Sequence, residues 1–529
     1  MRPAVRGLIG AAAVTALAAA TVVAAQAVPG LERTPAEQHT VNVATGVPVN
    51  VCPGPQTLIV PDGADRVPSP GPVTLTAVAT GPGSIGTLIP PADGAAAAPG
   101  TPRALRGVEG GVMVATSPLT TATGIRIDLS RGAASAAGTG QVASAVQTTL
   151  ATSGDLRGLT ATACTAPTDS AWLVGGGTTD SERDRLILSN PSSTPALLDV
   201  EVFGPRGAVR IPAGEGVVVP AGDQVALYVQ ALAPGLERMA VHVAVRTGRV
   251  SVSMQHSRVL GFTPGGLDEV AAAEPARTQV LPAVVVASPG SASVRVMVPG
   301  KDDAVVRIAL TPVTPVGRRP GAAPAPIVAT VSAGAVADVP LKDVPNGVWT
   351  ATISGDEEIA ASAVSTTTLP GGELAGTAAA LGRTVPPTDL VWSSAVPELT
   401  GTAMVALPRV PVEGGVTATL VLAGPVRPPT GAAGAPARVV VREIGADGRL
   451  GGPLPVTLEP GTSQQVNTAP GAAGLLLQPE AGTAAPRAAV ILGARDASGP
   501  MLSVVPVRSS VRSGAGALEA VADPGLALR

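Results

Sequence analysis

The sequence predicts an all-β protein, in which tandem immunoglobulin-like β-sandwich domains follow a single N-terminal hydrophobic helix. Hydrophobic residues make up 45% of the 529 residues and charged residues 14%, so apolar side chains suffice for several cores. Val and Leu alternate with polar residues in short runs that Gly and Pro interrupt, which is typical of strands joined by turns. Similar runs recur at roughly 90 to 120 residues, the size of an immunoglobulin domain.

The clearest unit of this pattern lies between Trp172 and Ser257. A strand that starts at Trp172 leads into three consecutive glycines, and apolar residues alternate again at residues 198–202. Apolar residues also alternate on both sides of a Thr-Gly-Arg turn, at residues 241–245 and 250–254. Matching alternation around a short turn predicts a β-hairpin.

The N-terminal segment 1–30 is predicted to be a membrane anchor or a signal peptide. Arg2 and Arg6 precede an uncharged, predominantly apolar run at residues 7–31. That length suffices to span a bilayer, and the arginines place its N-terminal end in the cytoplasm. Small residues at positions 24–27 also fit cleavage of a signal peptide. The predicted localisation is therefore the cell membrane, single-pass with the C-terminal bulk outside, or secretion after cleavage.

Composition and turn signals divide the exported part into four β domains. A strand at residues 390–392 is assigned to the start of the fourth domain, and residues 517–521 to a weak helix in the tail. Residues 133–151, rich in Ala, Gly and Ser, predict either a short helix or a mobile loop. The predicted boundaries are a stalk at 31–40, a first β domain at 41–168, a second β-sandwich at 169–268, a third at 276–385, a fourth at 386–507 and a flexible tail at 508–529.

Cys52 and Cys164 are the two cysteines of the chain. An exported chain meets an oxidising compartment, so the sequence predicts a Cys52–Cys164 disulfide that staples the first domain. Closing a loop of on the order of 100 residues stabilises a fold by roughly 4 to 5 kcal/mol in the chain-entropy model. A metal site is disfavoured, because two sulfurs without nearby histidines cannot complete a tetrahedral shell.

Charge and aromatic content limit the classes of partner. The formal net charge is −3 and aromatic residues make up 1% of the chain. A broad basic surface for nucleic acid is therefore not expected, and neither are stacked-ring platforms for sugars. The sequence predicts no nucleic-acid partner and no cofactor.

Contiguous enzyme signatures are missing from the sequence. The histidines are His39, His242 and His256, and none lies at helical metal-ligand spacing to another. Lys301 follows a glycine, but the residue after it is Asp302 where a phosphate-binding loop needs Ser or Thr. His242 is interpreted as a solvated or hydrogen-bonded strand residue. No catalytic, cofactor-binding or metal-binding residue is assigned.

Two kinds of turn have alternative interpretations. The glycines at 175–177, near Arg183 and Arg185, could cradle an anion with backbone N–H groups, but a plain turn is favoured because no helix is predicted to follow. The acidic turns at 302–303 and 356–358 could attract calcium, but they lack the alternating ligand spacing of a binding loop. Solvated turn charge is the favoured interpretation.

Three motifs carry a family resemblance: Cys-Pro-Gly-Pro at 52–55, Gly-Asp-Leu-Arg-Gly-Leu at 154–159 leading to Cys164, and Ala-Trp-Leu-Val-Gly-Gly at 171–176 leading to Leu-Ser-Asn-Pro at 188–191. Together with the export segment, they resemble an uncharacterised, domain-of-unknown-function family of exported, membrane-anchored tandem β-sandwich proteins of high-GC Gram-positive (actinobacterial) bacteria. The resemblance implies location and architecture, and no activity.

The expected function is that of a non-catalytic extracytoplasmic structural, scaffold or protein-binding component of the bacterial cell envelope. The expected partners are envelope proteins, including proteins that assemble or export polysaccharide, and the membrane through the N-terminal segment; no small-molecule substrate is identified. The alternative is an envelope polysaccharide-processing enzyme that uses a carboxylate pair, such as Asp356 and Glu358, in an inter-domain cleft.

Overall fold

The computed structural model divides the chain into two compact units. The larger unit is Val47–Gly514, and the smaller one combines Met1–Gly46 with Ala515–Arg529. The structure describes residues 40–44, 49–56, 73–80, 86–89, 103–105, 108–109, 111–119, 125–129, 142–261, 263–319, 321–368, 388–410, 415–427, 434–510 and 517–521.

The predicted all-β class is confirmed. In the described part of the chain, helix is confined to the 3-10 turn η1 (Pro212–Gly214) and to α2 (Val229–Leu232). No helix among these residues is long and apolar enough to cross a membrane. The anchor predicted for residues 1–30 lies outside the described residues.

The described residues of the smaller unit form a pair of strands from opposite ends of the chain. Strand β1 (Thr40–Ala44) pairs antiparallel with β35 (Ala517–Val521). The weak helix predicted for residues 517–521 is therefore wrong. Five residues are too few to sustain an isolated helix, whereas pairing with β1 supplies backbone partners.

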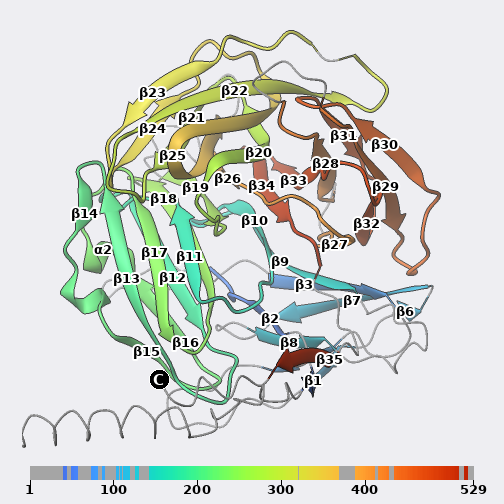
Figure 1. The fold of residues 1–529 in the computed structure, drawn as a ribbon, viewed down its shortest axis with the longest axis horizontal. Helices are drawn as coiled ribbons and strands as arrows, with labels where there is room; N and C mark the ends of the chain where they lie inside the picture. Colours follow the sequence, from blue (N-terminus) through green and yellow to red (C-terminus); the bar gives the residue numbers. More distant parts are fainter. Residues whose placement is uncertain are drawn as a thin grey trace, which may run out of the picture. The chain divides into compact units, whose positions relative to one another are not determined.

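The larger unit contains four repeats of one strand arrangement (Figure 1). Each repeat has eight successive strand positions, A to H, in two sheets of order A-F-C-D and E-B-G-H. In repeat one these are β2 (Val49–Cys52), β3 (Val73–Thr80), β4 (Gly86–Ile89), β5 (Arg103–Leu105), β7 (Val112–Leu119), β8 (Ile125–Leu129), β9 (Ala143–Ala151) and β10 (Gly158–Ala163), with β6 (Val108–Glu109) beside β7.

Repeats two to four follow the same order. Repeat two comprises β11 (Ser170–Val174), β12 (Glu182–Ser189), β13 (Ala196–Gly204), β14 (Gly207–Val209) with β15 (Val217–Val219) at position D, β16 (Gln224–Tyr228), β17 (Ala240–Thr247), β18 (Ser251–Leu260) and β19 (Thr263–Val270). Repeat three comprises β20 (Ala276–Val286), β21 (Gly290–Met297), β22 (Ala304–Pro315), β23 (Ile327–Val331), β24 (Val336–Pro340), β25 (Gly347–Thr368) at both F and G, and β26 (Thr388–Ser394). Repeat four comprises β27 (Ala403–Ala406), β28 (Thr417–Ala423), β29 (Ala437–Ile444), β30 (Leu454–Leu458), β31 (Ser463–Asn467), β32 (Gly474–Pro479), β33 (Arg487–Asp496) and β34 (Gly499–Val507).

The chain crosses from one sheet to the other between positions F and G. In repeat two, β17 pairs with β11 and β13, whereas β18 pairs with β12 and β19. The hairpin predicted at residues 241–254 is therefore wrong. Two facing sheets that share a core require the same alternation as a hairpin does, so the sequence pattern does not distinguish them. In repeat three the crossing is one continuous strand, β25.

This crossing also makes the strand order differ from that of an immunoglobulin domain. The immunoglobulin orders are A-B-E-D and C-F-G. The B–E and C–F pairs are present in all four repeats, but strand G pairs with B and strand A pairs with F. The edge strands of the two sheets are thus exchanged relative to the predicted fold.

Two other segments differ from expectation. Residues 143–151, within the segment predicted as helix or loop, form β9, which pairs with β3 on one side and β10 on the other. Strand β26, assigned from sequence to the start of the fourth domain, pairs with β25 and completes a sheet of repeat three. Its Leu-Val-Trp pattern resembles that of β11, but it occupies position H instead of position A.

Aliphatic side chains fill the space between the paired sheets. In repeat two, Leu173, Leu186, Val200 and Val241 come from both sheets and are buried in one cluster. A separate cluster fills repeat three. Repeats one and four instead share one continuous cluster that includes Leu159 of β10. These two repeats are therefore joined by hydrophobic packing.

The four H strands, β10, β19, β26 and β34, contact one another in cyclic order at the centre of the larger unit (Figure 1). Ser503 on β34 accepts a hydrogen bond from the backbone N of Ala161 on β10 at 3.0 Å and donates one to Oδ1 of Asp268 on β19 at 2.9 Å. The other oxygen of Asp268 accepts from the backbone N of Trp392 on β26 at 2.8 Å. One hydrogen-bonded chain therefore joins all four repeats.

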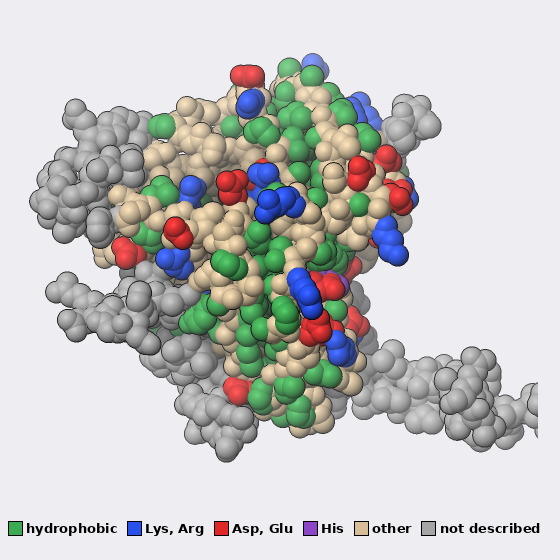
Figure 2. Space-filling model, turned by 90° about the vertical axis from the view of Figure 1, so that its left-hand side faces the viewer, with side chains coloured by type: hydrophobic (Ala, Val, Ile, Leu, Met, Phe, Trp, Pro, Cys, Tyr) green, Lys and Arg blue, Asp and Glu red, His purple; other side chains and the backbone are tan. Residues whose placement is uncertain are grey.

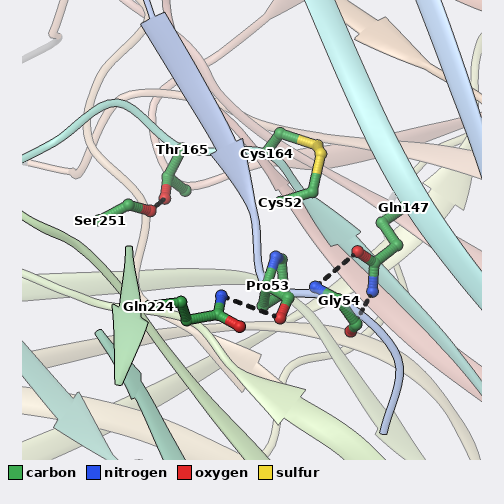
Figure 3. Close-up of a disulfide and its surroundings, with 8 residues drawn as sticks. All are labelled: Cys52, Pro53, Gly54, Gln147, Cys164, Thr165, Gln224 and Ser251. Atoms are coloured by element: carbon green, nitrogen blue, oxygen red, sulfur yellow. Dashed lines mark hydrogen bonds between the residues drawn. A yellow bond between two sulfur atoms is a disulfide. The ribbon is translucent and has the colours of Figure 1, made fainter. Parts of the chain in front are cut away.

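The predicted Cys52–Cys164 disulfide is confirmed (Figure 3). It joins β2 to the segment that follows β10, so it ties together the first and last strands of repeat one. Beside it, the backbone N of Gly54 donates to the side-chain oxygen of Gln147 at 2.9 Å, and Thr165 contacts Ser251 of repeat two at 2.7 Å between hydroxyl oxygens. The bridge therefore lies where repeat one meets repeat two.

Replacing both bridge cysteines, Cys52→Ser with Cys164→Ser, should lower the free energy of unfolding by roughly 4 kcal/mol, because the bridge spans 112 residues and its loss frees the unfolded chain. Chemical denaturation followed by circular dichroism measures the change. A phosphine reductant should destabilise the wild-type protein and leave the double variant unchanged. Equal sensitivity of both proteins to reductant would contradict the prediction.

The variant Ser503→Ala should lower the free energy of unfolding by roughly 2 to 4 kcal/mol, because it leaves Asp268 Oδ1 and the backbone N of Ala161 buried without this partner. The shift of the denaturation midpoint gives the value. Ser332→Ala, at an exposed position, is the matched control and should have little effect. Equal shifts for both variants would show that the central hydrogen bonds contribute nothing.

Candidate functional site

A cavity of about 1160 Å³ lies between repeats one, two and four. Three segments that include the ends of H strands and the residues after them supply most of its wall: residues 161–172 from β10 onward, 269–275 from β19 onward and 504–510 from β34 onward. The equivalent segments meet here because the H strands themselves meet. Its lining combines Ala, Val and Pro with many Ser and Thr residues and with several charged side chains. A concave wall that joins apolar surface with polar groups can hold a ligand and fix its orientation.

Glu269 is the buried acid of this cavity. It lies on β19 opposite Gln255 of β18, and its carboxylate accepts hydrogen bonds from Ser253 and from the Gln255 side chain, the latter at 3.4 Å. Burial raises the pKa of Glu269 to about 7, although these hydrogen bonds and the charge of Arg185 favour the ionised form. Glu269 can therefore gain or lose a proton near neutral pH.

Arg185 does not neutralise Glu269 by direct pairing. Its guanidinium donates to the oxygen of Gln255 at 2.9 Å and lies 5.9 Å from the ring centre of Tyr228. Burial lowers the pKa of Arg185, while the charges of Tyr228 and Glu269 oppose that shift. Burial therefore lowers the pKa of Arg185 and raises that of Glu269. A tight ion pair between them would shift each pKa in the opposite direction.

The cavity carries charges of both signs. Arg508 donates to the backbone oxygen of Ala272, and burial lowers its pKa while the charge of Glu274 opposes that shift. Arg249 faces Asp169 at 3.5 Å, and both side chains are mostly exposed. A ligand here meets separate cationic and anionic groups on an apolar wall.

Two more buried acids lie next to the cavity wall, in the central contact. Asp268 precedes Glu269 on β19 and so points to the opposite face of that strand. Burial raises the pKa of Asp268 well above its usual range, and the charge of Asp389 adds to the shift. Burial likewise raises the pKa of Asp389, which accepts a hydrogen bond from the backbone N of Leu502 at 2.5 Å. These groups serve the contact between repeats and do not line the cavity.

The triple-glycine turn lies against the protein's own Asp184 side chain. The backbone N of Gly177 donates to Asp184 Oδ2 at 3.0 Å, and Nδ1 of His256 lies 3.0 Å from Oδ1. Gly176 has φ of 75°, and a Cβ there would lie 2.5 Å from the Asp184 carboxylate. The glycines therefore allow a close approach to an internal carboxylate.

The other residues weighed from sequence lie away from the cavity. Asp356 accepts a hydrogen bond from the backbone N of Val305 at 2.8 Å, and Asp303 accepts one from the backbone N of Ala333 at 2.9 Å. Glu358 belongs to β25 and, like Asp356, is not among the residues lining the cavity. The structure therefore does not place the proposed Asp356–Glu358 pair in this cleft.

The model of a family of unknown function (DUF5719) matches residues 122–469. This match covers more than half of the chain. The chain belongs to this family. The DUF5719 match extends from β8 to the end of β31, so it contains repeats two and three completely. A comparison with curated proteins gives no match.

Membership of the DUF5719 family confirms the predicted uncharacterised domain family and assigns no activity. The actinobacterial origin and the membrane anchor stay predictions. Glu269 and Asp268, the acids that the structure singles out, were not identified from sequence. Both acids lie at the predicted boundary between the second and third domains, where the Pro-Gly-Gly of residues 264–266 is typical of a turn and not of a buried strand.

The free energy of unfolding of this DUF5719 protein should fall as pH rises from about 4.5 to about 7. The folded protein keeps the Glu269 proton at pH values where the unfolded chain has released it. The effect of this group is roughly 3 kcal/mol between the two ends of that range. Asp268 and Asp389 shift in the same direction. Denaturation curves at pH 4.5 to 8 measure the slope.

The variant Glu269→Gln should flatten this slope. The free energy of unfolding of the variant, relative to that of the wild type, should be higher at pH 8 than at pH 4.5. Glu215→Gln, at an exposed position, is the control and should keep the wild-type slope. If Glu269→Gln and the wild type have the same pH dependence, the buried carboxyl of Glu269 does not titrate as stated.

Proposed function

We infer that this protein is an extracytoplasmic scaffold that binds a segment of another envelope protein. The cavity between repeats one, two and four carries the proposal. Three extended chain segments border it, and it offers apolar wall together with separate charges of both signs. A polypeptide segment matches this chemistry, because it combines apolar side chains, charges and backbone hydrogen-bonding groups.

A polysaccharide or an anionic polymer fits the cavity and the protein surface less well than a polypeptide does. Among the described residues that line the cavity, Trp172 is the one aromatic residue, so these residues do not support stacking of several sugar rings. Figure 2 shows acidic and basic side chains interspersed among hydrophobic and neutral ones on the side of repeat two. A mixed surface provides no broad electrostatic attraction for an anionic polymer. Both observations favour a protein partner, with proteins of polysaccharide assembly or export as candidates.

The envelope location rests on the predicted N-terminal export segment. The Cys52–Cys164 bridge supports it, because structural disulfides persist in oxidising compartments. The B–E and C–F pairs shared by all four repeats support a second part of the proposal, that the repeats are tandem sandwiches related to the immunoglobulin type. Tandem sandwiches held by one central contact form a rigid support for a bound segment.

Filling the cavity should weaken partner binding. Ala166 is an exposed residue of the cavity wall, and Ala166→Trp places a large side chain inside it. Crosslinking in cells, followed by purification of the full chain, should enrich an envelope protein with the wild type and at least about tenfold less with Ala166→Trp, a loss of about 1.4 kcal/mol.

Ala323→Trp, at an exposed position that does not line the cavity, is the matched control and should bind like the wild type. Recovery of glycan alone, with no protein enriched over a control that carries only residues 1–40, would refute the proposal. Equal enrichment with Ala166→Trp and the wild type would place the binding surface elsewhere.

A further inference from the structure

Three polar side chains of repeat two form a connected row beside the cavity. Ser170, His242 and Glu201 lie on the adjacent strands β11, β17 and β13 of one sheet. Ser170 and Glu201 are 72 and 41 residues from His242 in sequence. A search for contiguous enzyme motifs therefore could not detect this combination.

Strand register brings the three residues together. His242 is the partner of Trp172 on one side and of Glu201 on the other. Ser170 lies two positions before Trp172 and so projects from the same face of the sheet. The Ser170 hydroxyl oxygen is 3.1 Å from Nε2 of His242, and Nδ1 of His242 is 2.8 Å from the Glu201 carboxylate.

The hydrogen bonds define the roles of the two ring nitrogens. An ionised carboxylate only accepts hydrogen bonds, so Nδ1 of neutral His242 carries the proton toward Glu201. Nε2 then presents its lone pair to the Ser170 hydroxyl. The ring stacks on Trp172, with centroids 4.2 Å apart and planes inclined by 14°. Packing and hydrogen bonds therefore hold the imidazole in the orientation that a general base needs.

Ser170 is accessible from the cavity. Both Ser170 and Trp172 line it, and Ser170 is exposed. Thr168, just before β11, holds the backbone of the serine: its hydroxyl donates to the backbone carbonyl oxygen of Ser170 at 2.8 Å and accepts from the backbone N of Ser170 at 3.3 Å. A bound acyl group on the apolar wall can thus approach the hydroxyl.

We propose that Ser170 is a nucleophile for acyl transfer, with His242 as its general base and Glu201 as the residue that positions His242. The ligand class is an ester of an aliphatic or peptidyl acid, whose acyl part packs on the Ala- and Val-rich cavity wall. The order Ser–His–carboxylate and its two hydrogen bonds follow the logic of serine hydrolases. This activity goes beyond the binding role and does not depend on it.

The reaction balances without a cofactor. Ser170 Oγ attacks the ester carbonyl while its proton moves to Nε2 of His242. The C–O bond to the alcohol then breaks, and the alcohol leaves with that proton, so an acyl–Ser170 ester remains. In the second half of the reaction water is the nucleophile. It loses a proton to Nε2 and attacks the acyl carbonyl, the acid is released, and Ser170 regains its proton.

Covalent labelling of the full chain with a fluorophosphonate tests the proposal. The probe should modify the peptide that contains Ser170, and mass spectrometry locates it. Ser170→Ala should abolish this labelling, and His242→Gln should slow it by about 100-fold or more, as expected for loss of a general base. Ser332→Ala, exposed and outside the cavity lining, should label like the wild type.

Glu201 is tested as a positioning residue with p-nitrophenyl esters. Glu201→Gln should lower kcat with little change in KM, because a glutamine can donate to Nδ1 and shift the ring proton to Nε2. Glu201→Asp, which still only accepts, should recover part of the rate. Circular dichroism confirms that each variant is folded.

Absence of labelling in the folded wild type, or labelling that survives Ser170→Ala, would overturn the inference. Equal rates for Glu201→Gln and Glu201→Asp would remove the positioning role. The labelling assay needs no partner protein, so a negative result leaves the scaffold proposal intact. Conversely, loss of partner capture by Ala166→Trp does not bear on the reactivity of Ser170.

Discussion

The hydrogen-bonded chain through Asp268 and Ser503 is the constraint on which the larger unit depends. It contacts one strand of each repeat, and each of its bonds crosses from one repeat to another. The three segments that enclose the cavity include the last residues of β10, β19 and β34. A change in the angle between two H strands would therefore change the shape of the binding wall as well.

Buried carboxyl groups are an unusual choice for such a contact, because burial disfavours their charged forms. Asp268 and Asp389 are stabilised in this buried position because each accepts a hydrogen bond from a backbone N–H group on a strand of another repeat. Arg157 of repeat one and Asp496 of repeat four add a bidentate pair at 2.6 and 3.0 Å. Polar groups in an apolar contact permit fewer arrangements than aliphatic groups do, so they select one docking geometry among several that Val and Leu would allow.

Alternation of apolar and polar residues predicted the strands well where one face of the strand packs in the core and the other is polar. Residues 198–202, where apolar residues alternate, lie within β13, and the disulfide followed from the cysteine count. Alternation could not show where the chain changes sheets, because residues 241–245 and 250–254 point into the same core from opposite sides. Residues 143–151 combine Val and Thr, which favour strands, with Ala, Ser and Gln, which do not, and pairing with β3 and β10 makes them a central strand.

The site was less predictable than the fold, since its parts come together only through strand order. His242 was interpreted as a solvated strand histidine, and no local feature connects it with Ser170 or Glu201. Their proximity requires that β11 and β13 flank β17, and the predicted immunoglobulin order would pair the first strand with the second. The same limitation applies to Glu269, whose environment is built from repeats one and two.

The core that repeats one and four share has a consequence for synthesis. The N-terminal repeat is synthesised first. Its apolar residues that pack against repeat four, among them Val146 and Leu159, therefore stay unpacked until nearly the whole chain has been made. During this interval the repeat is vulnerable to aggregation. Both cysteines are already present at that stage, and the inner core around Cys52 and Cys164 lies within repeat one. In an oxidising compartment, early formation of this bridge would keep repeat one folded until the last repeat packs against it.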